Sequence, residues 1–252
     1  MKRILFTMLV AAGLMVTMTP LARADALLTI DVSGTPVTCN TSAAFTATNC
    51  GAGFTAVAGG NTISFTGTVN GVSFGGGSTV GVQLTNNSPG TSALGFATDT
   101  KTTVNNTSSG SRTIAVLFAV NNFTLPAGTP LPLTAAQGVD LITSSANITE
   151  TFSGFGNAAN SLTGVPTTIL ATPPCTAPAG TSTVCSTSAG PVNFPRVGAF
   201  ALGGAEGFTL VAGAITNAHA SVTVTPAIPE PTSVLLLGSG MLLLVGLKLR
   251  KK

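Results

Sequence analysis

The stretch "NTISFTGTVNGVSF", Asn61 to Phe74, decides the fold class of this chain. Its apolar residues alternate with small polar ones, at Ile63, Phe65, Val69 and Val72. A period of two is the pattern of a β-strand that is buried on one face. Asn70-Gly71 stands between two valines, and this dipeptide is a strong signal for a tight hairpin turn. We therefore expect an antiparallel β structure.

The same pattern continues through the body of the chain, residues 25–227. Short β-branched runs occur at "LLTIDVS", "STVGVQLTN", "NITETF", "GFTLVAG" and "HASVTVTP", with Gly, Asn, Ser and Pro between them. "RTIAVLFAV" is continuously apolar from Ile114 to Val120, which predicts a central strand buried on both faces. About ten short strands with frequent turns predict an all-β domain, either an antiparallel β sandwich or a jelly roll.

Two segments of the body are interpreted differently. "PLTAAQGVDLI", from Pro132, has room for one turn of helix. The stretch from Pro173 to Pro195 is rich in Pro, Ser and Thr, so we expect a long surface excursion there. Because cysteines staple this excursion, it is not interpreted as a domain boundary.

The chain is poor in charge and in aromatic residues. Charged residues make up 7% of its 252 residues, where about 25% is usual. The net charge of +3 comes from the termini, since the body has three cations, Lys101, Arg112 and Arg196, against six anions. No basic stripe with interleaved aromatics is present, so we expect no nucleic-acid partner. A neutral chain rich in hydroxyls and amides favours an extracellular or matrix protein.

Four cysteines form two pairs that are close in sequence, Cys39 with Cys50 and Cys175 with Cys185. In an exported protein an even number of cysteines predicts disulfides, and three pairings can be drawn. We favour the two local pairings. Free thiols and a zinc site are the alternatives; zinc is disfavoured because there is no Cys-x-x-Cys and His219 is the only imidazole.

Residues 1–24 have the three parts of a secretory signal peptide. Lys2 and Arg3 give a positive start, and an apolar stretch runs from Ile4 to Met18. Ala22 and Ala24 are the small residues of a cleavage site before Asp25. We therefore expect export, with an uncleaved membrane anchor as the alternative.

Residues 228–252 predict a membrane-spanning segment. The run from Thr232 to Leu247 carries no charge. As a helix it would span about 24 Å, somewhat short of a hydrocarbon core of about 30 Å. The basic side chains after it can extend to the interface and shorten the gap. Because cations mark the cytoplasmic side, the body should lie outside the cytoplasm. These topology anchors are Lys248, Arg250, Lys251 and Lys252.

Pro229-Glu230-Pro231, the apolar run with its small residues at "GSG", and the basic tail occur in this order at the end of the chain. Together they resemble the PEP-CTERM sorting signal of Gram-negative bacteria. The resemblance covers about the last 25 residues. It implies that Pro229, Glu230 and Pro231 form the recognition motif of an exosortase, a membrane transpeptidase. It also implies an inner-membrane anchor before processing, followed by the cell surface or the extracellular matrix, in company with exopolysaccharide and biofilm machinery.

Catalytic groups are scarce in the body. A hydrolase triad needs a histidine, and the sole candidate is His219, which we expect at an exposed strand edge. A glycosidase needs two carboxylates facing one sugar, and Glu150 and Glu206 are the candidates. Their spacing does not show whether they meet, and lone acids in such a chain are usually solvated. We therefore predict no enzymatic activity.

No metal or cofactor site is expected. Calcium favours clusters of acidic residues, whereas Asp31, Asp99 and Asp140 are isolated in the sequence. The glycine-rich stretches lack the Gly-Lys-Ser/Thr of a phosphate-binding loop.

Three functions remain in order of preference. The first is an exported, non-enzymatic protein of the cell surface or extracellular matrix, sorted by its C-terminal signal. The second is a carbohydrate-binding, lectin-like module, against which the absence of Trp and Tyr counts. The third is a secreted polysaccharide hydrolase, which the scarcity of His and acids disfavours.

Overall fold

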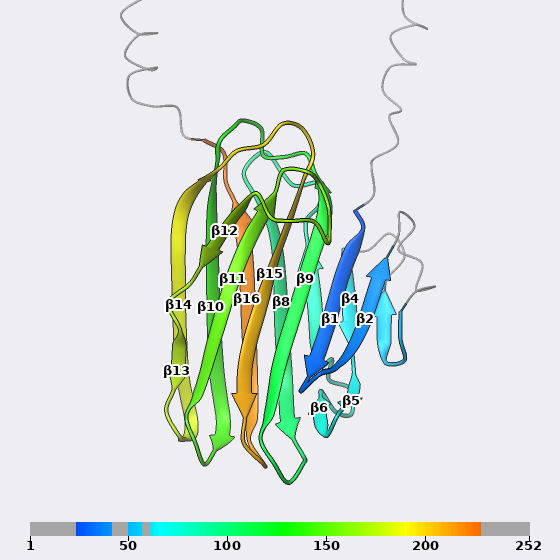
Figure 1. Ribbon diagram of the computed structural model, residues 1–252, viewed down its shortest axis with the longest axis vertical. Coiled ribbons are helices and arrows are strands. Elements are labelled where there is room, and N and C mark those ends of the chain that lie inside the picture. Colours follow the sequence, from blue (N-terminus) through cyan, green and yellow to red (C-terminus); the bar gives the residue numbers. More distant parts are fainter. Residues whose placement is uncertain (1–23, 42–49, 57–60, 228–252) are drawn as a thin grey trace, which may run out of the picture.

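Two antiparallel sheets lie face to face in the computed structural model (Figure 1), which describes residues 24–41, 50–56 and 61–227. The predicted β sandwich is therefore confirmed for these residues. The predicted N-terminal signal peptide, apart from Ala24, and the predicted C-terminal membrane helix lie outside the described residues. Within the described ranges no helix is long and apolar enough to cross a membrane.

The front sheet of Figure 1 has seven strands in the order β12-β11-β15-β9-β1-β2, with β13 also beside β11. Their bounds are β1 Ala26–Val32, β2 Thr35–Thr41, β9 Arg112–Phe123, β11 Ile148–Asn157, β12 Thr168–Ala171, β13 Cys175–Ala177 and β15 Phe200–Leu210.

The back sheet has nine strands in the order β14-β10-β16-β8-β7-β4-β3, and the β5–β6 hairpin joins it through β8. Their bounds are β3 Phe54–Ala56, β4 Thr62–Phe65, β5 Gly67–Val69, β6 Val72–Phe74, β7 Val82–Asn86, β8 Gly95–Asn106, β10 Leu131–Ser144, β14 Gly180–Phe194 and β16 Ile215–Val224. Many strands are thus longer than the short ones that the sequence predicts.

The predicted hairpin at Asn70-Gly71 is present. Val69 pairs with Val72, and both turn residues have positive φ, 44° at Asn70 and 79° at Gly71. Positive φ at both central residues is the requirement of the turn that matches the twist of a hairpin, and Asn and Gly tolerate it best.

Three details of the sequence interpretation are wrong. "PLTAAQGVDLI" contains no helical turn and lies within β10. Most of the stretch from Pro173 to Pro195 is the long edge strand β14, which pairs with β10, rather than an irregular excursion. β9 is central, as expected, but its outer face is covered only from Ala119 onward, because Ala115 and Leu117 are exposed.

The core between the sheets is filled by inward side chains of alternate residues. Phenylalanine rings fill much of this core. Phe118 is stacked on Phe152 with ring centroids 6.1 Å apart, and Phe123 on Phe200 with ring centroids 5.5 Å apart. Gly204 on β15 lies between the first two rings: a Cβ there would overlap the ring of Phe152 and lie 3.0 Å from Phe118 Cζ. The glycine is therefore needed for the rings to approach each other.

Disulfides join Cys39 to Cys50 and Cys175 to Cys185, as the sequence predicts. Cys39 belongs to the edge strand β2 of the front sheet, and Cys50 precedes the edge strand β3 of the back sheet. At the other edge, Cys175 on β13 is joined to Cys185 on β14. Each disulfide therefore ties the front sheet to the back sheet, at opposite edges of the sandwich.

Candidate functional site

The residues of the C-terminal sorting signal lie outside the described part of the chain. These are the motif Pro229, Glu230 and Pro231 and the basic anchors Lys248, Arg250, Lys251 and Lys252. Their roles remain predictions. The segment that leads to them, residues 225–227, leaves the end of β16 with Thr225 and Ala227 exposed.

His219 is exposed, as expected, but it lies in the middle of β16 rather than at a strand edge. It faces outward and packs over Gly138 of β10, where a Cβ would lie 3.0 Å from its Nε2. Glu150 and Glu206 point into the sandwich instead. The structure therefore does not bring His219 together with either acid.

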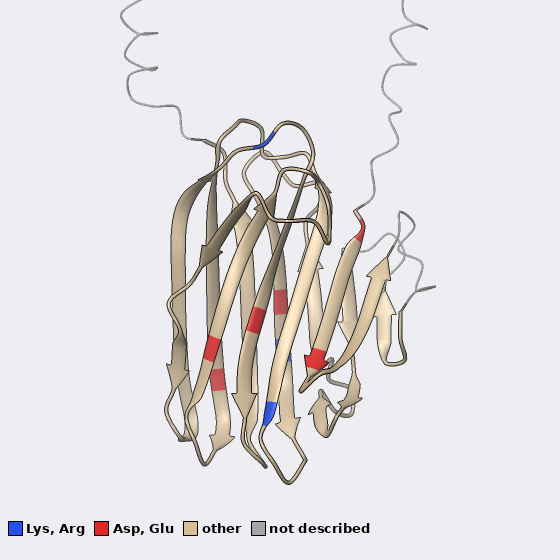
Figure 2. Cartoon of the chain, in the orientation of Figure 1, with Lys and Arg blue, Asp and Glu red and all other residues tan. Residues whose placement is uncertain are grey.

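The chain carries few charged residues (Figure 2), and four of them have side chains that are buried between the sheets. The expectation that Glu150 and Glu206 are solvated is wrong, since they are 0% and 3% exposed. Asp99 and Lys101 of β8 are 0% and 1% exposed. We call these four residues the inner charge cluster.

Strand alternation and register explain how the cluster assembles. Glu206 on β15 pairs with Phe152 on β11, and Glu150 pairs with Phe208, so the two glutamates are diagonal neighbours on one face. Asp99 and Lys101 are two residues apart on β8 of the opposite sheet and therefore share its inward face.

Lys101 holds the two sheets together electrostatically. Its Nζ donates to Asp99 Oδ2 at 2.5 Å and to Glu206 Oε2 at 2.6 Å, and all three side chains are inaccessible to solvent. Burial alone would lower the pKa of Lys101, but the two carboxylates outweigh it and raise that pKa above its usual range. Lys101 is therefore held as an ammonium.

Glu150 is the acid that stays protonated. Burial, repulsion by the Glu206 carboxylate and a hydrogen bond to it raise the pKa of Glu150 to about 10. Without that proton, both oxygens of Glu150 and Oε1 of Glu206 have no donor. Burial also raises the pKa of Asp99 to about 6, against the opposing effect of Lys101. Near neutral pH the cluster thus holds a carboxylic acid beside an ammonium and carboxylates.

Gln137 on β10 borders the cluster. Its Nε2 donates to the carbonyl oxygen of Pro173 at 2.7 Å, to Thr187 Oγ1 at 3.0 Å and to the carbonyl of Glu150 at 3.4 Å. Its Oε1 has no partner among the described residues. The amide therefore ties the start of β13 to the back sheet and to β11.

Sequence reasoning took Asp99 as an isolated acid and missed its buried pairing with Lys101, and a signal of burial existed only for the glutamates. Along β15, Glu206 stands between Gly204 and Phe208 in the inward register, and Glu150 stands between Ile148 and Phe152 on β11. An acid at an otherwise apolar inward position is the sign of a buried polar group.

The acidic residues do not form a metal site within the described ranges. Asp140 is exposed on β10. Asp31 accepts the backbone N–H of Gly34 at 2.7 Å and so supports the β1–β2 turn. Calcium has no cluster of oxygen ligands at either position.

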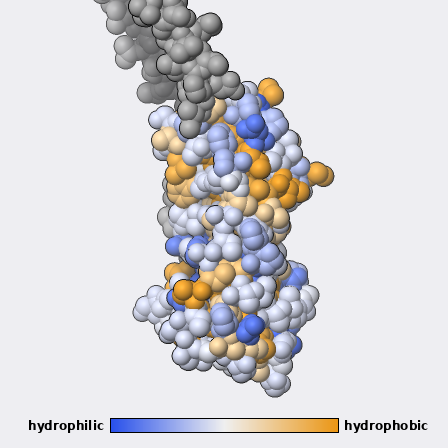
Figure 3. Space-filling model, turned by 90° about the vertical axis from the view of Figure 1, so that its left-hand side faces the viewer, coloured by the Kyte–Doolittle hydropathy of each residue, from blue (hydrophilic) through white to orange (hydrophobic). Residues whose placement is uncertain are grey.

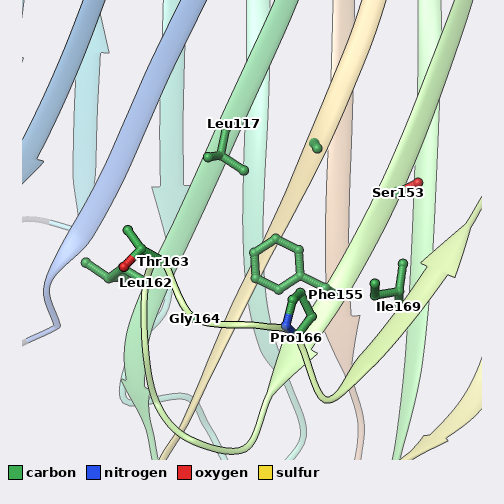
Figure 4. A pocket seen from close by; sticks show the side chains of 9 residues that line it. Leu117, Ser153, Phe155, Leu162, Thr163, Gly164, Pro166 and Ile169 are labelled. Carbon is green, nitrogen blue, oxygen red and sulfur yellow. The ribbon is translucent and has the colours of Figure 1, made fainter.

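An apolar groove of about 290 Å³ lies on the outer face of the front sheet (Figure 4). Phe155 of β11 forms its floor, and the loop that carries Leu162 and Pro166 passes over the sheet beside it. Leu117 and Ile169 are exposed at its borders. Ser153 and Thr163 add hydroxyls, so the groove suits a small apolar group better than a charged one.

Arg196 occupies a hollow beside the segment 124–129. Its guanidinium donates to four carbonyl oxygens at 2.8 to 3.1 Å, those of Thr124, Pro126, Gly128 and Gly198. It also lies over the ring of Phe200, 5.1 Å from the centroid. These contacts use most of its donors, so its role is to hold loops together.

Seen from the side of β14, the surface carries separate apolar patches among neutral and hydrophilic atoms (Figure 3). No described phenylalanine is exposed, and Phe54 and Phe96 are the half-buried ones. Threonine hydroxyls meet on exposed strand faces, as between Thr149 and Thr176 at 2.9 Å. The described surface therefore offers hydroxyls rather than aromatic rings.

No protein-family model and no curated protein matches the chain. Among solved structures it is similar to the TNF protein Eiger of S. frugiperda, with 14% identity, 41% of this chain and 64% of that chain covered, and a TM-score of 0.19. It is also similar to the family GH12 endoglucanase 3 of Trichoderma harzianum, with 14% identity and a TM-score of 0.24. That match covers 70% of this chain and 99% of the endoglucanase chain. A third similar structure is a family 11 carbohydrate-binding module of Clostridium thermocellum in complex with a β-1,3-1,4-mixed-linked tetrasaccharide, with 12% identity and a TM-score of 0.18. That match covers 61% of this chain and 100% of the module. At these TM-scores the similarities do not bear on function.

Proposed function

We propose that this protein is an exported, non-enzymatic component of the cell surface or extracellular matrix, sorted by residues 228–252. The observation that carries the proposal is the pair of disulfides that close opposite edges of the sandwich. Disulfides of this kind are typical of proteins in oxidising compartments outside the cytoplasm.

The position of the chain ends supports sorting from the C-terminus. β1 begins and β16 ends at the same end of the sandwich (Figure 1). Thr225 and Ala227 are exposed after β16. In the sequence the Pro-Glu-Pro motif comes directly after this exposed end of the folded body. By this proposal the exosortase acts on Pro229, Glu230 and Pro231.

The surface chemistry supports contact with neutral polymers. Threonine pairs on exposed faces, such as Thr29 with Thr38 at 3.1 Å and Thr113 with Thr209 at 3.4 Å, present hydroxyls that hydrogen-bond to sugars or to neighbouring copies. Exopolysaccharide is therefore the proposed surrounding.

The two alternatives gain less support. A lectin site usually stacks a sugar on an aromatic ring, and no described phenylalanine is exposed. A hydrolase built on Glu150 and Glu206 would need the substrate to enter the core, because neither carboxylate reaches the surface.

Localisation of the full chain in its host, with and without the exosortase, tests the proposal. Deletion of residues 228–252 should release the body to the periplasm or medium. Alanine at Pro229, Glu230 and Pro231 together should leave an unprocessed chain in the inner membrane. Pro226→Ala, also a proline substitution but outside the motif, is the matched control and should be processed normally.

Envelope retention that survives the deletion would contradict the proposal. A reporter fused after Lys252 should be active on the cytoplasmic face alone; periplasmic activity would reverse the proposed topology. Binding of the purified chain to one defined saccharide on a glycan array would favour the lectin alternative instead.

A further inference from the structure

The amine of Lys101 lies against a carboxylate of the opposite sheet in a site without water access. Lys101 Nζ is 2.6 Å from Glu206 Oε2, and both side chains are inaccessible to solvent. The strand partners are apolar: Glu206 pairs with Phe152 and Val116, and Lys101 with Ala218 and Val82. The two groups therefore meet in a fixed geometry inside the core.

Burying such a charge cluster between two sheets is unfavourable in free energy. Removing ammonium and carboxylate groups from water often costs more than their attraction returns. Here the oxygens also outnumber the donors, since Asp99 Oδ1 and Glu206 Oε1 have no partner. A reaction that removes a positive and a negative charge together would relieve this cost.

We propose that Lys101 and Glu206 condense into an intramolecular amide that covalently joins the two sheets. The attacking nitrogen is in contact with one oxygen of the carboxyl group, so the carbonyl carbon is close to the range of about 3 to 3.5 Å of a near-attack geometry. Because the two side chains are inaccessible to solvent, the reverse reaction, hydrolysis, can draw only on the one water molecule that the condensation releases.

The step balances without an oxidant or any other co-reactant. Lys101 Nζ forms a bond to Glu206 Cδ, one carbon–oxygen bond of that carboxyl breaks, and the departing oxygen leaves as water. Both of its protons come, in sum, from the Lys101 ammonium. An ammonium and a carboxylate are thus converted into a neutral amide and one water molecule.

Asp99 and Glu150 move the protons. Asp99 Oδ2, at 2.5 Å, accepts the first proton of Lys101 and frees the lone pair for attack. Glu150, the diagonal neighbour of Glu206 on β11, is kept protonated by burial and supplies a proton to the departing oxygen. Each acid recovers its initial state when the remaining protons are redistributed.

Glu206 is a better acyl partner than Asp99. Asp99 is two residues from Lys101 on the same strand, so an amide between them would close a small ring within β8. An amide to Glu206 connects residues 105 positions apart in the sequence. It would stand at the centre of the sandwich, between the disulfides that tie its two edges, and it is independent of the proposed sorting role.

Peptide mapping of the full chain, purified from its host with both disulfides formed, tests the proposal. After reduction, trypsin and cleavage at phenylalanine, an unmodified chain releases Thr102–Arg112, because Lys101 is then a tryptic site. The amide blocks this cleavage. The expected product joins Ala97–Arg112 to Ala201–Phe208, with a mass lower by one water than the sum of the two peptides. Neither disulfide connects these peptides, and processing at either terminus leaves both intact.

Variants identify the partner. Lys101→Met and Glu206→Ala should lose the joined product. Glu206→Gln should form it with release of ammonia, and therefore with the same product mass as the native chain. Glu150→Gln should slow its appearance after synthesis, without changing the product.

Two results would overturn the proposal, and both can be read from the native chain alone. One is full release of Thr102–Arg112 from protein whose disulfides are paired. The other is loss of water confined to Ala97–Arg112, which would make Asp99 the acyl partner.

Discussion

The ammonium of Lys101 lies 2.6 Å from the carboxylate of Glu206, and this contact crosses the core from the back sheet to the front sheet. Both residues of this contact pair with apolar residues on a neighbouring strand, Glu206 with Val116 and Lys101 with Val82. The stability of the sandwich should therefore depend on a few charged residues in a way that the rest of this neutral chain does not.

Lys101→Met should be less stable than the triple variant Asp99→Asn, Lys101→Met, Glu206→Gln by about 3–5 kcal/mol, because in the single variant Asp99 and Glu206 remain as buried carboxylates without their cation. Neither variant can form the proposed amide, so the difference in stability reports the buried charges alone. Denaturant unfolding near neutral pH measures this difference. Equal stability of the single and triple variants would refute this role of the ammonium.

The free energy of unfolding should fall as the pH rises from about 5 to about 10. Over this range the unfolded chain loses the Glu150 proton that the folded chain keeps, since burial raises the pKa of Glu150 from 4.5 to about 10. The slope can reach about 1.4 kcal/mol per pH unit. Asp99 adds a slope of the same sign between about 4 and 6. Unfolding midpoints measured over the pH range check this.

Glu150→Gln should flatten this slope and raise the stability at the alkaline end. Asp140→Asn, which removes an exposed carboxylate from β10, should leave the slope unchanged. A native chain that becomes more stable as the pH rises would show that Glu150 is ionised in the fold.

Gly204→Ala should destabilise the sandwich by about 1–3 kcal/mol, because the added methyl overlaps the Phe152 ring in a filled core. Gly207→Ala on the same strand is the matched control. Its Cβ would meet nothing closer than Thr151 Oγ1 at 3.6 Å, so its stability should remain close to native. Thermal unfolding of both variants distinguishes steric overlap from a general intolerance of β15 to alanine.

Removal of either disulfide by paired Cys→Ala substitutions should cost about 3 kcal/mol, as expected for a short closed loop. The closed loops are similar, with sequence separations of 11 for Cys39–Cys50 and 10 for Cys175–Cys185. Because the two disulfides lie at opposite edges of the sandwich, the losses of stability caused by removing each of them should be additive. A combined loss much smaller than the sum, in denaturant unfolding, would show that the edges are coupled.

The strands that the sequence predicts best are those with one apolar face. Around Asn70-Gly71 a turn signal and alternating residues agree, and the hairpin forms as expected. β14 could not be predicted in this way, because its residues are mainly Ser, Thr, Ala and Gly and much of the strand is exposed. Its conformation is fixed by pairing with β10, a partner that no local pattern reveals.

The inner charge cluster was harder to foresee for a similar reason. Apolar neighbours in the inward register mark Glu150 and Glu206 as buried, but the cation that compensates Glu206 comes from the other sheet. Lys101 stands in the polar run "TDTKTT", where alternation does not reveal which face is inside. Its partner follows from the stacking of the sheets, which is a long-range property.

The shared location of the two described chain ends has a consequence for a molecule held at a membrane beyond Ala227. The end of the sandwich farthest from Ala227 is formed by the turns at residues 107–111, 145–147 and 211–214 (Figure 1). None of these turns contains a charged residue. A molecule that first contacts this end would meet hydroxyls, amides and small apolar groups, with Arg112 of β9 as the nearest cation (Figure 2), so its affinity should depend only weakly on ionic strength.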